Sequence, residues 1–104
     1  MDDVVDRPAL GWWLAIEGGL GLLALVALSP AAYALWATRV TGAFSQSRLL
    51  ALLVVSLLVH VGEALYARRI AQRLGLAADG WFWQTLALGF PSLRLLRARA
   101  RARR

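Results

Sequence analysis

Two long apolar stretches restrict the fold of this chain more than any other feature. The first holds 21 uncharged residues between Glu17 and Arg39, and the second holds 19 residues between Arg48 and Arg68, with His60 and Glu63 as its only ionisable groups. A helix of about 20 apolar residues spans a hydrocarbon core about 30 Å thick. Both stretches are therefore predicted to cross a membrane as helices, over about residues 9–36 and 47–72.

The composition excludes the other common classes of protein. The chain is 60% hydrophobic and 17% charged, whereas soluble domains are about half apolar and a quarter charged. Disordered chains are poor in aliphatic and aromatic residues, and this chain has five tryptophans. Without cysteine it can form no disulfide, iron–sulfur cluster or thiol nucleophile, and its single histidine makes a zinc or haem site improbable. We therefore expect no cofactor and no metal site.

A third apolar segment is too short for an upright crossing. Gly80 to Leu93 is uncharged for 14 residues, which is about 21 Å of helix at about 1.5 Å per residue. If Arg94 extends its guanidinium to the headgroups, the helix can reach about residue 96 and cross while tilted. The predicted fold is thus an all-α integral membrane protein, a bundle of three transmembrane helices with the third, over 80–96, short or tilted. A re-entrant or interfacial third segment is the alternative.

This reading divides the chain into a polar N-terminal segment (1–7), a membrane domain (8–96) and a basic tail (97–104). Pro30 lacks an amide donor and restricts the residue before it, so a kink is expected near residue 30. A signal peptide is disfavoured because residues 1–7 contain three aspartates and one arginine, whereas a signal peptide begins with positive charge.

Arginines indicate the orientation, because positive charge is retained on the cytoplasmic side. With three crossings, one side carries Arg7, Arg68, Arg69 and Arg73. The other side carries Arg39, Arg48, Arg94, Arg97, Arg99, Arg101, Arg103 and Arg104. Eight against four predicts a cytoplasmic C-terminus and an external N-terminus. Twelve arginines without a lysine, in a chain rich in Ala and Leu, suggest a GC-rich bacterial genome and hence a bacterial cytoplasmic membrane.

The basic tail has two interpretations. In the favoured one, it is a signal that sets the orientation of the protein in the membrane. In the other, its arginines attract anionic lipid headgroups at about 1 kcal/mol each. Nucleic acid is not expected as a partner, because no aromatic residue interleaves these arginines as a stacking platform. The candidate headgroup contacts are Arg97, Arg99, Arg101, Arg103 and Arg104.

Polar residues inside the apolar segments are the candidates for a functional site, because charge in a membrane helix is costly. Ser56, His60 and Glu63 follow a spacing that places them on one helical face. His60 and Glu63 are one turn apart, close enough for the carboxylate to hydrogen-bond the imidazole. Three crossings would bring Glu17 and Gln84 to the same side of the membrane. The ligand-binding candidates are Ser56, His60, Glu63, Tyr66, Gln84 and Thr85; no catalytic residue is assigned, and the candidates for that role are His60, Glu63 and Glu17.

The same residues also have a structural reading, in which polar side chains hold helices together at about 0.6 kcal/mol on average. Small residues permit the close helix approach that this reading requires. The candidate packing positions are Gly11, Ala15, Gly19, Gly62 and Gly89.

Two runs of sequence carry a resemblance to a known family. His60 to Ala67 reads HVGEALYA, and Trp81 to Leu93 reads WFWQTLALGFPSL. Together they resemble the small membrane-protein family typified by transmembrane protein 254, over Leu58 to Leu93. The resemblance implies three membrane helices but no established biochemical activity. It marks as signature positions His60, Gly62, Glu63, Tyr66, Gln84, Thr85 and Gly89.

Two functions are therefore expected. The favoured one is a small, non-enzymatic multi-pass protein, a structural or interaction component that contacts the lipid bilayer and either a second copy or another membrane protein. The alternative is a lipid- or sterol-binding protein, or an enzyme that uses His60 and Glu63 in the manner of sterol isomerases similar to emopamil-binding protein. That second resemblance is one of architecture, which does not carry function by itself.

Overall fold

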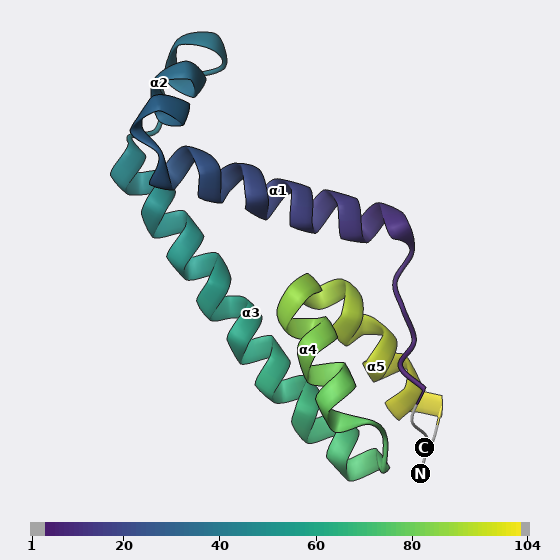
Figure 1. Cartoon of the computed structure of the whole chain (residues 1–104). Helices are drawn as coiled ribbons and strands as arrows, with labels where there is room; N and C mark the ends of the chain where they lie inside the picture. The colour runs from purple at the N-terminus through teal and green to yellow at the C-terminus, as the bar shows by residue number, and fades with distance from the viewer. Residues whose placement is uncertain (1–3, 103–104) are drawn as a thin grey trace.

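A computed structural model describes residues 4–102 of the chain. This part forms five helices, and their arrangement is shown in Figure 1. The helices are α1 (Leu10–Leu28), α2 (Pro30–Arg39), α3 (Gln46–Leu74), α4 (Ala78–Leu88) and α5 (Phe90–Ala102).

Local sequence signals set the helix boundaries. The Ser29 hydroxyl accepts a hydrogen bond from the amide of Ala32 at 3.2 Å and caps α2, which begins at Pro30. The expected kink near residue 30 is therefore a complete break, and the predicted helix over 9–36 is two helices. Ser45 caps α3 in the same way, and Gly75 ends α3 with a φ of 69° that favours glycine.

Helices α1 and α3 form the two arms of a V (Figure 1). They meet at a cluster of buried side chains that includes Val26 and Ala27 of α1 with Leu49 and Leu53 of α3. The Gln46 side-chain amide donates to the carbonyl oxygen of Ala27 at 3.2 Å, which ties the end of α1 to the start of α3. Within the described residues, these two helices are the ones long and apolar enough to cross a membrane.

The predicted third crossing is a helical hairpin. The chain breaks at Gly89 into α4 and α5, which are 11 and 13 residues long, or about 16 and 20 Å at 1.5 Å per residue, and each is shorter than a hydrocarbon core. Figure 1 shows α4 leaving the end of α3 and α5 running back beside it. The segment over 80–96 is therefore two helices and not the one tilted helix predicted, and the bundle of three transmembrane helices is not confirmed.

The hairpin packs on the second half of α3. Its core joins Ala67 and Ala71 of α3 to Trp81 of α4 and Leu96 of α5, all fully buried. The alanines leave room for the large indole, so α3 and α4 approach closely. This core fixes the hairpin against the end of α3 that carries Arg68, Arg69 and Arg73.

Both ends of the described chain lie at the same end of the molecule (Figure 1). The Arg99 guanidinium forms an ion pair with the Asp6 carboxylate at 2.7 Å. The prediction placed these two residues on opposite sides of a membrane. The hairpin removes that separation because it returns α5 to the side from which α4 started.

Candidate functional site

Two of the predicted site residues lie beside the tip of the hairpin. His60 and Glu63 come from α3, one turn apart, and both face Gly89 at the break between α4 and α5. A Cβ atom built on Gly89 would lie 3.2 Å from His60 Nε2 and 3.4 Å from Glu63 Oε1. The site is therefore built from a helix face and a backbone turn that passes close over it.

His60 supplies a hydrogen bond that the end of α4 lacks. Its Nδ1 lies 2.8 Å from the carbonyl oxygen of Leu86. A carbonyl oxygen can only accept, so Nδ1 carries the hydrogen in this contact. The last carbonyl groups of a helix have no partner within the helix, and the break at Gly89 leaves that of Leu86 in this position. His60 therefore acts as a cap donated by the neighbouring helix.

Gly89 makes the break possible. Its φ of 71° and ψ of −131° belong to a region that residues with a Cβ rarely adopt. Gly89 is also buried, with His60 and Glu63 packed against it. Both the backbone conformation and the close approach thus require glycine at this position.

The remaining predicted members of this cluster lie elsewhere. The expected hydrogen bond between His60 and Glu63 does not form; the hydrogen bond of His60 is the one between Nδ1 and the Leu86 carbonyl oxygen. Ser56 is half-buried on α3, one turn before His60. Glu17 is exposed on α1, and its side chain contacts no hydrogen-bonding or ionic partner within residues 4–102. The three ionisable groups therefore do not form one site.

Gln84 and Thr85 belong to a second, buried polar cluster. The Gln84 amide donates to the carbonyl oxygen of Asp6 at 2.7 Å and to the Ser92 hydroxyl at 3.0 Å. The hydroxyls of Thr85 and Ser92 lie 2.9 Å apart and share a hydrogen bond. These contacts join α4 to α5 and attach the N-terminal segment to both. Sequence reasoning missed Ser92 and Asp6, since their pairing depends on the turn at Gly89.

Within residues 4–102, most of the predicted packing residues are not packed against another helix. A Cβ atom on Gly11, Gly19 or Gly62 would meet nothing within 4 Å, and Ala15 is exposed. Gly19 lines an apolar cavity of about 310 Å³ at the junction of α1, α2 and α3. Packing of these residues against another chain stays a prediction, whereas Gly89 packs within this chain.

The arginines of the tail have different surroundings. Arg99 pairs with Asp6, whereas Arg97 and Arg101 line a cavity between α3 and α5 that Tyr66 also lines. Arg103 and Arg104 lie outside the described residues. Within residues 4–102, no group of three His, Cys, Asp or Glu side chains is placed to hold a metal ion.

The fold and the polar clusters together define a helical membrane protein with two apolar helices and a packed hairpin held by buried polar contacts. The profile of a known family, described as transmembrane protein 254, matches residues 11–98 of the chain. The chain belongs to this family. The match extends well before Leu58, where the sequence resemblance began, and so includes α1 and α2. No curated protein and no solved structure gives a significant match.

Proposed function

We propose that this protein is a non-enzymatic interaction component of the membrane that uses α1 to contact another membrane helix. The observation that carries the proposal is the exposure of α1: within residues 4–102, Val26 and Ala27 are the only residues of this helix that are buried. A membrane helix with such exposure contacts either lipid or a partner.

The composition of α1 favours a partner helix over lipid alone. Glu17 projects from the helix without a partner in the described chain. A charged group within a membrane helix costs about 2.5–3.5 kcal/mol on insertion scales, so such groups usually face other protein. Gly11 and Gly19 leave open space, which allows a second helix to approach closely.

The other polar residues support a structural role. His60 bonds to a backbone carbonyl, and Gln84 and Thr85 bond to Ser92. Neither His60 nor Glu63 lines the apolar cavity at α1, α2 and α3, which begins at Leu52, about 12 Å along the helix from His60. A hydrophobic substrate in that cavity would not reach the ionisable pair, which disfavours the isomerase-like alternative.

We further propose that α1 and α3 cross the membrane and that both ends of the chain are cytoplasmic. With the hairpin folded back, the end where the described chain begins and ends carries seven arginines within residues 4–102, and the other end carries Arg39 and Arg48. The seven are Arg7, Arg68, Arg69, Arg73, Arg97, Arg99 and Arg101, whereas Arg94 lies about one turn after the break at Gly89. Positive charge is retained in the cytoplasm, which supports a cytoplasmic position for both ends of the described chain, in place of the external N-terminus expected from three crossings, in a bacterial cytoplasmic membrane.

Native mass spectrometry of the protein released gently from its own membrane tests the interaction role. We expect wild type to carry a second copy or another membrane protein. Gly11→Leu should release that partner, because the added side chain fills the open space on α1. Gly62→Leu is the matched control, since Gly62 also faces open space but lies on α3.

Two results would count against the proposal. A wild-type protein without any protein partner would remove the interaction role. A discrete hydrophobic ligand that wild type retains, and that a folded His60→Ala, Glu63→Gln double variant loses, would instead favour the lipid-binding or enzymatic alternative.

A further inference from the structure

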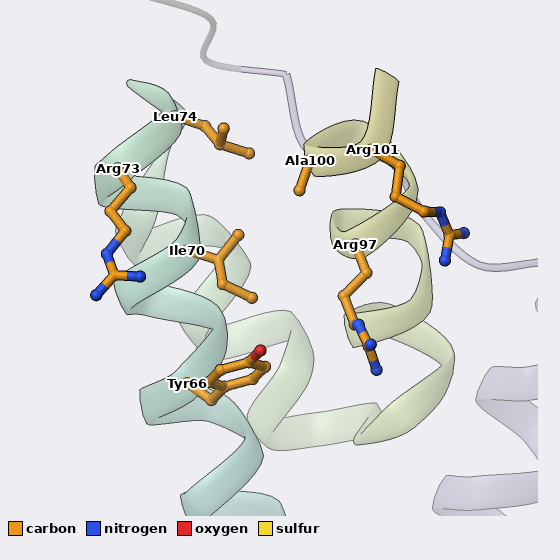
Figure 2. Close-up of a pocket in the computed structure, with 7 residues that line it drawn as sticks. All are labelled: Tyr66, Ile70, Arg73, Leu74, Arg97, Ala100 and Arg101. Atoms are coloured by element: carbon orange, nitrogen blue, oxygen red, sulfur yellow. The ribbon is translucent and has the colours of Figure 1, made fainter. Parts of the chain in front are cut away.

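We infer that the cavity between α3 and α5 is a binding site for the phosphate headgroup of one anionic phospholipid. The cavity measures about 460 Å³. Figure 2 shows Tyr66 and Ile70 projecting from α3 toward α5, and Arg97 lying along α5 with its guanidinium toward the Tyr66 end. Arg73 and Arg101 flank the opening on the outer sides of the two helices.

The lining matches the two chemical parts of a phospholipid. At one end the Arg97 guanidinium lies toward Tyr66, and the apolar side chains of Ile70 and Ala100 face the space between the helices; Arg73 and Arg101 also line the cavity, with their guanidinium groups on its outer sides. Guanidinium groups form strong, paired hydrogen bonds with phosphate oxygens. Apolar side chains next to such a group can receive the first carbons of an acyl chain.

The charges of these three arginines are not compensated by the described chain. Three other arginines have partners, whereas Arg69 has none within residues 4–102: Arg68 pairs with Asp79, Arg94 lies over the Trp12 ring, and Arg99 pairs with Asp6. Within residues 4–102, Arg73, Arg97 and Arg101 have no carboxylate partner.

The spacing of the arginines on α5 also favours the binding of an anion. Arg97 and Arg101 are four residues apart and share one helical face, where like charges repel. An anion bound at the Arg97 guanidinium relieves that repulsion. The cavity therefore has a geometric place for a negative group and an electrostatic reason to hold one.

The position of the cavity along α3 selects a lipid as the source of the phosphate. The apolar stretch of α3 ends at Ala67, and Arg68, Arg69 and Arg73 follow. Tyr66 stands at this boundary, where aromatic side chains meet the headgroup region. The cavity thus begins at the edge of the apolar surface and opens toward the arginines, as a headgroup joined to an acyl chain requires.

The site can be tested in vesicles of equal parts phosphatidylcholine and phosphatidylglycerol, with native mass spectrometry of the extracted full chain to count each retained lipid. Wild type should retain phosphatidylglycerol in preference. A triple variant, Arg73→Gln, Arg97→Gln and Arg101→Gln, should lower that preference by about tenfold or more, because each arginine near an anionic surface contributes roughly fivefold.

A second triple variant, Arg7→Gln, Arg39→Gln and Arg48→Gln, removes the same charge outside the cavity and should keep most of the preference. Equal losses in both triple variants would overturn the site and leave only diffuse attraction, which salt screens. If the first triple variant does not fold, Arg97→Gln alone decides: an unchanged preference would overturn the proposal, and a loss of about fivefold would support it.

Discussion

Arg99 holds Asp6 through two hydrogen bonds, from Nε to Oδ2 at 2.7 Å and from Nη2 to Oδ1 at 2.9 Å, across 93 positions of sequence. Paired contacts of this kind between guanidinium and carboxylate are among the stronger polar interactions in proteins. The pair places the start of the chain beside α5. This ion pair depends on the hairpin, because a straight third crossing would separate the two residues by the width of a membrane.

The first prediction concerns this topology. The chain has no cysteine, so a single introduced cysteine reports one position. With a membrane-impermeant maleimide, Val4→Cys and Ala102→Cys should be labelled from the cytoplasmic face and Ala43→Cys from the outer face. Three crossings would instead place Ala43→Cys and Ala102→Cys on one face, opposite Val4→Cys.

The second prediction concerns the break at Gly89. Gly89→Ala places a Cβ in a strained backbone conformation, with His60 Nε2 at 3.2 Å. We expect a loss of about 1–3 kcal/mol in the free energy of unfolding, measured by titration with a denaturing detergent. Gly62→Ala is the control: it lies within α3 in open space, where alanine should stabilise by up to about 1 kcal/mol. Similar values for the two variants would show that Gly89 is not under this constraint.

The third prediction concerns the contact of His60 with the end of α4. His60→Ala leaves the part-buried Leu86 carbonyl without its donor, which costs at most the roughly 1–3 kcal/mol of a fully buried group. Amide hydrogen exchange over residues 86–93, measured in lipid nanodiscs, should become faster as the hairpin tip loosens. Ser56→Ala, on the same face of α3 but outside the contact, should leave exchange unchanged. Equal exchange in both variants would remove the capping role of His60.

The membrane class and the extent of α3 could be predicted from the sequence because both depend on apolar length. The predicted α3 ran from 47 to 72, and the observed helix is Gln46–Leu74. Its apolar run and Gly75 are local signals, so no tertiary contact was needed to locate them.

The hairpin could not be predicted from length alone. Fourteen uncharged residues allow either one tilted helix or two short ones, and the choice depends on Gly89 adopting a φ of 71° over His60 and Glu63. Glycine is compatible with both a helix interior and a break. For the same reason Ser92 was missed: its bonds to Gln84 and Thr85 exist only when the chain turns back.

The prediction that Glu17 shares a site with His60 depended on the crossings being parallel. In the structure α1 diverges from α3 as the arm of a V (Figure 1), and Glu17 is exposed without a hydrogen-bonding or ionic partner within residues 4–102. A sequence pattern gives the face of a helix but not the angle between two helices.

The last prediction concerns the buried cluster of Gln84, Thr85 and Ser92. Ser92 is fully buried, and its hydroxyl is the shared partner of the other two side chains. Ser92→Ala should therefore cost about 1–3 kcal/mol in the free energy of unfolding, because it leaves buried polar groups without a partner.

A double variant separates this explanation from a simple loss of packing. Thr85→Val, added to Ser92→Ala, replaces both hydroxyl partners by apolar groups, which is often close to neutral for a hydrogen-bonded pair. The double variant should consequently lose less stability than the sum of the two single variants, measured by detergent unfolding followed through tryptophan fluorescence, to which the buried Trp81 contributes. Strict additivity would show that the two hydroxyls are not coupled, and the cluster would then not hold α4 to α5.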